Sequence, residues 1–114
     1  MDIHYLEVVS NDVDREISIL AAAQGLTFGD PVMELGGARV ADVPSGGMIG
    51  VRGPMHGGEK LVARPYFLTD ALSDRVRALR ELGAEIALES MEIPGRGTIA
   101  IYFVDGIEYG LWQV

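Results

Sequence analysis

The first residues of this 114-residue chain that are suited to chemistry are His4 and Glu7. An imidazole beside a carboxylate can serve as a general acid and base, because neighbouring groups tune the pKa of both. Both residues lie in Ile3–Val9, a run rich in β-branched and aromatic residues that predicts a strand. Side chains alternate between the two faces of a strand, so Glu7 falls on the face opposite to His4, where an unpaired carboxylate against a helix would be costly. We therefore expect that Glu7 either pairs with a base such as Arg15 or is turned toward His4 by a β-bulge, which would make the two a catalytic pair.

A second set of residues suits the binding of a small organic molecule. A guanidinium can hold a carboxylate or phosphate through two parallel hydrogen bonds, and aromatic rings offer surfaces for stacking. The candidate ligand-binding residues that combine these properties with apolar surface are Met48, Arg52, Arg64, Tyr66, Glu108 and Trp112. The alternative is that Arg64 and Glu108 form an ion pair with each other and that nothing else binds there.

The composition disfavours several other functions. With 17 acidic and 9 basic residues the net charge is −8, which argues against nucleic acid and anionic membranes as partners, because both are bound through clusters of Lys and Arg. The absence of cysteine removes thiolate metal sites and cysteine nucleophiles. The sequence shows no signal peptide and no apolar run long enough to span a membrane, so we expect a cytoplasmic protein. It also shows no phosphate-binding glycine loop ahead of a helix and no recognisable Ser/His/Asp motif.

The rest of the sequence predicts the elements that must position these residues. After the first strand, Asn11 or Asp12 caps a helix that starts at about Val13 and stops at Gly25. Three short strands follow, at Pro31–Leu35, Arg39–Val43 and Met48–Arg52. Beyond a glycine-rich linker the order repeats, with a strand at Leu61–Leu68, a helix over Leu72–Leu79 that is capped by Thr69 and Asp70 and stopped at Gly83, and strands at Glu85–Glu89, Thr98–Val104 and Ile107–Gln113.

Each half therefore predicts the order β-α-β-β-β within a single domain of residues 1–114. Module one covers about residues 1–53, the linker about 54–60 and module two about 61–114. A constant spacing of 60 residues supports a duplication, because it relates His4 to Arg64, Gly46 to Gly106 and Gly50 to Gly110. The alternative is a generic α+β sandwich in which the repeated order is coincidental.

The two ends of the chain resemble the vicinal oxygen chelate superfamily, which includes glyoxalase I, the extradiol dioxygenases and the bleomycin and fosfomycin resistance proteins. Ile3–Val9 followed by Asp12 and Val13 resembles the first strand and helix start of that superfamily, and Asp105–Gln113 resembles its closing strand. The resemblance implies an α+β fold of two tandem βαβββ modules, whose strands form a curled mixed sheet around a central cavity with the helices outside. It also implies a homodimer.

The metal site of the superfamily is not matched. In the metal-dependent members, a His or similar residue on the first strand of each module and a Glu on the last strand of each hold a divalent ion. The resemblance places His4, Arg64, Gly50 and Gly110 at these positions, so only His4 could serve as a ligand. We therefore predict no cofactor and no metal, although a divalent ion held by other ligands stays possible.

Strand alternation gives the residues expected to face the cavity. If His4 points inward, the residues that share its face in the two modules are Leu6, Val8, Met48, Gly50, Arg52, Arg64, Tyr66, Leu68, Glu108, Gly110 and Trp112.

The leading hypothesis is a metal-free protein, similar to glyoxalase and the bleomycin resistance proteins, that binds a small organic molecule, anions included, between its modules. One alternative is a lyase, isomerase or dioxygenase of the same superfamily that uses a metal or the acid–base pair of His4 and Glu7. Another is a structural domain whose cavity is vestigial. Whether the protein is an enzyme is left open.

Overall fold

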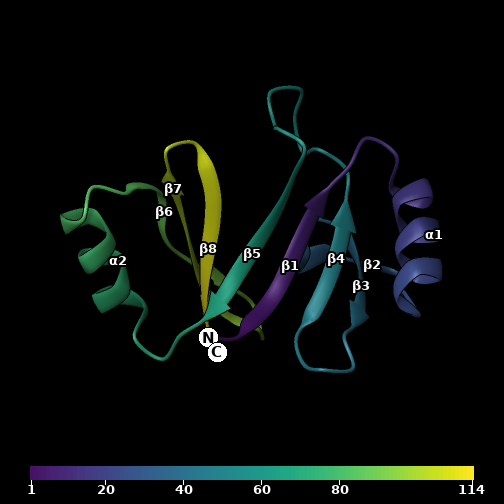
Figure 1. Ribbon diagram of the computed structural model, residues 1–114, viewed down its shortest axis with the longest axis horizontal. Helices are drawn as coiled ribbons and strands as arrows, with labels where there is room; N and C mark the ends of the chain where they lie inside the picture. The colour runs from purple at the N-terminus through teal and green to yellow at the C-terminus, as the bar shows by residue number, and fades with distance from the viewer. The chain divides into compact units, whose positions relative to one another are not determined.

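Two α-helices and eight β-strands follow one another in the order β-α-β-β-β in each half of the chain, as predicted. The computed structural model describes residues 1–114, and its contacts divide them into two units. Unit 2 comprises residues 5–63, and unit 1 comprises residues 64–114 together with residues 1–4. The first four residues thus pack with the second half of the chain. The ribbon in Figure 1 is coloured from purple at the N-terminus to yellow at the C-terminus.

Unit 2 holds four strands and the first helix. Its strands lie in the order β2-β3-β4-β1, with β1 parallel to β4 and the other pairs antiparallel. Their bounds are β1 Ile3–Val9, β2 Pro31–Val32, β3 Ala38–Asp42 and β4 Met48–Arg52. Helix α1, Val13–Gln24, begins where the Asp12 carboxylate accepts the N–H of Arg15 and ends at Gly25, whose φ is 68°. Both ends of α1 agree with the prediction, because a short acidic side chain and a left-handed glycine are strong local signals.

The strand predicted at Pro31–Leu35 is wrong beyond Val32. Residues Met33–Leu35 form a turn of 3₁₀-helix instead. Gly36 and Gly37 both have positive φ, and their N–H groups bond back to the carbonyls of Met33 and Val32. These local hydrogen bonds close the chain on itself and leave no room for further pairing with β3.

Unit 1 repeats the arrangement with strand order β5-β8-β7-β6 and with β5 parallel to β8. Its elements are β5 Val62–Leu68, α2 Leu72–Glu81, β6 Glu85–Ile93, β7 Gly97–Val104 and β8 Ile107–Gln113. The core of unit 1 is formed by Leu72 and Val76 of α2 against Ala100 and Leu111 of the sheet. Strand β6 runs four residues beyond the predicted Glu89, with two irregularities in its pairing with β7.

Helix α2 begins differently from the prediction. The Thr69 hydroxyl does accept a hydrogen bond, but from the N–H of Ala71, which precedes the helix. The first helical N–H, that of Leu72, is instead bound by Oε1 of Gln113 at 2.8 Å. The cap of α2 is thus supplied by the last residue of β8. The helix ends at Glu81, one residue before Leu82, and Gly83 follows with positive φ.

Neither helix combines the length and the apolar character that crossing a membrane would require.

Candidate functional site

In unit 1, four of the predicted ligand-binding residues share one face of the sheet. The parallel register sets Tyr66 beside Gly110 and Leu68 beside Trp112, which puts Tyr66 and Trp112 on the same side as Arg64 and Glu108. Phe67 and Leu111 point to the opposite side, where they pack against α2. We call the cluster of Arg64, Tyr66, Glu108 and Trp112 the polar face of unit 1.

The charges of this face are paired with each other. Nη2 of Arg64 donates to Oε1 of Glu108 at 2.8 Å, and Nη1 lies 3.4 Å from the Tyr66 hydroxyl. The side chains of Arg64 and Glu108 are 8% and 15% exposed. The ion pair between Arg64 and Glu108, which the sequence analysis gave as the alternative to ligand binding, is therefore present. A ligand anion on this face would have to compete with Glu108 for Arg64.

The aromatic part of the face is built around Trp112, which is 1% exposed. Its Nε1 donates to the carbonyl of Arg96 at 2.8 Å. The Tyr66 ring meets it edge-on at 5.7 Å between centroids, and the His4 ring lies at 5.1 Å. Burial lowers the pKa of His4 below its usual 6.5, because the charged imidazolium loses hydration. His4 is therefore a neutral partner of Trp112 at neutral pH.

Both glycines at the expected carboxylate positions are covered by tyrosine rings. A Cβ built on Gly110 would lie 2.8 Å from Cγ of Tyr66 and closer still to the ring edge. A Cβ on Gly50 would lie 2.6 Å from Cζ of Tyr5 and closer still to its hydroxyl oxygen. In each unit a side chain at the glycine would overlap an aromatic ring. The rings therefore occupy the space that a metal-binding glutamate side chain at either position would need.

In unit 2 the centre of charge is Arg52, which is 4% exposed. Its Nε donates to Glu7 at 2.9 Å, and its two terminal nitrogens donate to the two oxygens of Glu59 at 2.8 and 2.7 Å. Glu59 also accepts the N–H of Met55 at 2.7 Å. The hydrogen bond from Arg52 holds the pKa of Glu59 at about 2, and the same bond raises the pKa of Arg52. Arg52 thus joins β1 and β4 to the linker.

The structure does not bring His4 and Glu7 together. The register between β1 and β4 runs without a bulge from Tyr5 to Val9, so the two side chains point to opposite sides of β1. Glu7 is buried, as its place opposite to His4 implied, but its base is Arg52 and not Arg15. The sequence could not indicate this, because Arg52 lies 45 residues away.

The prediction that Leu6 and Val8 share a face of the unit 2 sheet with Met48, Gly50 and Arg52 is also wrong. Leu6 and Val8 lie beside Ile49 and Val51, whereas the residues beside Met48, Gly50 and Arg52 are Tyr5, Glu7 and Val9. The constant spacing of 60 residues caused the error. Because Glu7 pairs with Gly50 and Tyr66 pairs with Gly110, the internal equivalent of Arg64 is Tyr5 and not His4.

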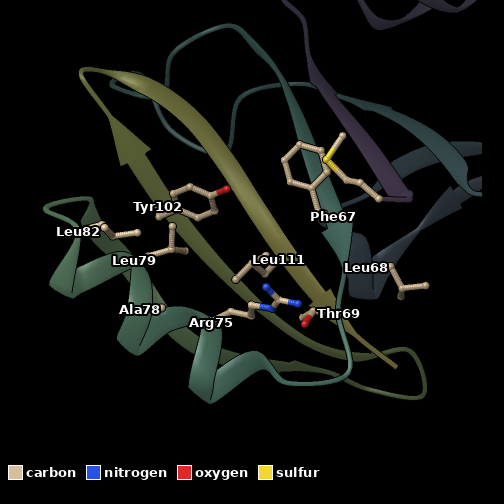
Figure 2. A pocket seen from close by; sticks show the side chains of 10 residues that line it. Phe67, Leu68, Thr69, Arg75, Ala78, Leu79, Leu82, Tyr102 and Leu111 are labelled. Atoms are coloured by element: carbon tan, nitrogen blue, oxygen red, sulfur yellow. The ribbon is translucent and has the colours of Figure 1, made fainter.

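A pocket of about 550 Å³ lies on the other side of the unit 1 sheet, between the sheet and α2 (Figure 2). Its wall and floor include Phe67, Thr69, Arg75, Leu79, Tyr102 and Leu111. Sequence reasoning missed this site. Arg75 carried no signal, because it follows the pattern of a solvated helix face.

Comparison with known proteins places the fold. No family model matches the sequence, and no curated protein does. Among solved structures, a hypothetical protein from Bacillus halodurans C-125 matches with a TM-score of 0.71 at 10% identity, over 99% of this chain and 94% of that one. A glyoxalase/bleomycin resistance protein/dioxygenase superfamily member from Vibrio splendidus 12B01 matches with a TM-score of 0.66 at 13% identity, over 96% and 97%. Streptomyces coelicolor methylmalonyl-CoA epimerase, solved with 2-nitronate-propionyl-CoA, matches with a TM-score of 0.64 at 17% identity, over 99% and 94%.

This chain has the vicinal oxygen chelate fold. Its residues do not fit the metal that the fold commonly holds. Tyr5, Gly50, Arg64 and Gly110 stand at the equivalent places of the two modules, and they offer neither a carboxylate nor an imidazole. No three His, Cys, Asp or Glu side chains gather anywhere in the chain in a way that could hold an ion.

Proposed function

We propose that this chain binds a small organic molecule without using a metal ion at the position typical of the vicinal oxygen chelate fold. The observation that carries the proposal is the cover of Gly50 and Gly110 by the rings of Tyr5 and Tyr66. A divalent ion needs several oxygen or nitrogen ligands, and the two carboxylates are replaced here by hydrogen atoms beneath aromatic rings. The permanent charge of Arg64 would also repel a cation.

The polar face of unit 1 is the proposed binding surface. Arg64 can hold a planar organic acid once the acid displaces Glu108, and the rings of Tyr66 and Trp112, which are 3% and 1% exposed in the free chain, would then lie beside it. A ligand carboxylate that replaces Glu108 at Arg64 would keep the buried guanidinium compensated. Arg52 and Met48 of unit 2 are weaker candidates, because Arg52 already binds two carboxylates of its own chain.

The test of the metal-free proposal is elemental analysis of the purified protein, combined with thermal unfolding in the presence of Ni²⁺, Zn²⁺, Mn²⁺ or Fe²⁺. We expect less than stoichiometric metal and the same change in melting temperature for the wild type and His4→Ala. A stoichiometric ion that is lost in His4→Ala would overturn the proposal.

The binding surface is tested with a panel of planar carboxylic acids. Glu108→Gln removes the competing charge, and it is expected to increase the affinity of Arg64 for such acids. Glu89→Gln is the matched control, because Glu89 is an exposed glutamate paired with Arg80 on the rim of unit 1. Equal affinities for the two variants would argue against Arg64 as the anion site.

We further propose that the protein is cytoplasmic and, by analogy with the superfamily it resembles, that it is a homodimer. Sedimentation at micromolar concentration checks the assembly, and a purely monomeric species would contradict it.

A further inference from the structure

The pocket between α2 and the sheet of unit 1 contains a cation that no carboxylate of the chain neutralises. Helix α2 carries three arginines. Arg77 pairs with Asp74, and Arg80 lies 3.6 Å from Glu89. Arg75 has no carboxylate within 4.0 Å, and it is the one of the three that lines the pocket. The chain has 17 acidic and 9 basic residues, so most of its cations can find a carboxylate partner within the chain. An arginine that forms no such ion pair can bind an external anion.

The floor of the pocket is aromatic. Phe67 and Tyr102 line it, and the ring of Tyr109 stacks between them, at 6.1 Å from Phe67 and 5.4 Å from Tyr102. The interplanar angles are 30° and 21°, so the three rings are stacked in a row across β5, β8 and β7. Burial raises the pKa of Tyr102, so its ring stays neutral near pH 7. Such a row gives the pocket an apolar, aromatic floor, which favours an apolar ligand body.

A hydroxyl stands where the charged end of that body would lie. Figure 2 shows Arg75 reaching from α2 toward Thr69 at the end of β5. The Thr69 oxygen accepts the N–H of Ala71, but its hydroxyl hydrogen has no acceptor in the chain. Arg75 and Thr69 can therefore both donate to one anionic group.

The surroundings also limit the charge of the ligand. A smaller cavity of about 330 Å³ adjoins the pocket and shares Thr69 and Arg75 with it, and Asp70 is part of its lining. The Asp70 carboxylate in that lining disfavours a second negative charge on the ligand close to Arg75. The volume of about 550 Å³ lies within the range of sites that enclose small organic molecules.

We propose that this pocket is a binding site for an amphipathic monoanion, an aryl carboxylate or aryl sulfonate, whose flat body lies over Phe67 and Tyr102 and whose charge is held by Arg75 and Thr69. The site is separate from the polar face of unit 1, because it lies on the opposite side of the sheet. The proposal for this pocket does not depend on the metal-free proposal, and each can be tested without the other.

The test compares two fluorescent probes of the same shape, 1-anilinonaphthalene-8-sulfonate and the uncharged N-phenyl-1-naphthylamine, in titrations of the full chain. The wild type is expected to bind one sulfonate per chain. Arg75→Gln should weaken binding of the sulfonate by about tenfold or more, the size expected for a lost charge-assisted hydrogen bond, and should change binding of the uncharged probe by less than about twofold.

Two further variants make the result specific. Arg77→Gln changes the net charge by the same amount outside the pocket, so it should leave both affinities within about twofold. Ala78→Trp places a large ring into the pocket from an exposed helix position and should abolish binding of both probes. Circular dichroism and melting temperature establish first that each variant is folded.

Three outcomes would overturn the proposal. Equal loss of sulfonate binding in Arg75→Gln and Arg77→Gln would mean that the dye responds to overall charge. Unchanged binding in folded Ala78→Trp would place the dye elsewhere. Binding that falls as the protein concentration rises at a fixed dye ratio would mean that a second copy of the chain fills the groove.

Discussion

The ring of Tyr66 lies directly over the backbone of Gly110, so close that a single methyl group on the glycine would overlap it. Tyr66 and Gly110 are neighbours in the parallel pairing of β5 with β8. Glycine is thus required at this position by packing, because only a residue without Cβ lets the ring lie flat on the strand.

We expect Gly110→Ala to lower the free energy of unfolding by about 1–3 kcal/mol, the usual cost of overpacking a buried site. Gly57→Ala is the control, because nothing lies within 4 Å of its Cβ position and its φ is not left-handed, and it should change stability by no more than about 0.5 kcal/mol. Urea denaturation measures both. Equal effects of the two substitutions would show that the ring moves aside at no cost.

The pairing of Arg52 with Glu59 predicts a dependence of stability on pH. The pKa of Glu59 falls from its usual 4.5 to about 2 on folding, so the folded state favours the ionised carboxylate. This contribution is complete above pH 4.5 and is lost as the pH falls through about 2. The stability difference between the wild type and Glu59→Gln should therefore shrink between pH 5 and pH 2. A difference that stays constant over this range, in chemical denaturation at each pH, would contradict the assignment.

The long-range cap of α2 gives a second test of stability. Gln113→Ala leaves the N–H of Leu72 without its acceptor and should cost about 1 kcal/mol, as the loss of other N-terminal caps does. Gln113→Glu retains the acceptor and adds a charge that the helix dipole favours, so it should be close to the wild type. If Gln113→Glu is as unstable as Gln113→Ala, the oxygen of Gln113 does not cap the helix.

His4 should titrate below pH 6.5, because burial disfavours its charged form. A base with a lowered pKa in the folded state contributes stability above pH 6.5 that is lost as the pH falls through its folded value. The ring-proton chemical shifts of His4, assigned by comparison with His4→Gln, measure the midpoint. A midpoint at or above 6.5 would mean that the ring beside Trp112 is hydrated.

Much of the fold was predictable because its signals are local. Asp12 and Gly25 mark the ends of α1, and the strand Met48–Arg52 was predicted with its observed bounds. The 3₁₀ turn after Val32 was missed, because two left-handed glycines outweighed the strand preference of the residues before them.

The site was less predictable, because it depends on register and on distant partners. Alternation within each strand, carried across the proposed repeat, grouped Arg64, Tyr66, Glu108 and Trp112, and the register of unit 1 agrees with that grouping. The spacing of 60 residues, however, predicted His4 as the equivalent of Arg64 in the first module. The pairing of the strands at Gly50 and Gly110 shows that the equivalent residue is Tyr5. The partnership of Arg52 with Glu59 had no signal, because Glu59 lies in a linker without periodicity.

Unit 1 contains both ends of the chain, and Figure 1 draws the two termini together. The N–H of Leu68 bonds to the carbonyl of Asp2, and the next N–H, that of Thr69, bonds to the carbonyl of Trp112. His4 therefore reaches Trp112 from a part of the sequence that lies before the whole of unit 2. A cut between the exposed Gly57 and Gly58 would leave unit 1 split between two polypeptides, so His4 would stay beside Trp112 only while the two pieces remain associated.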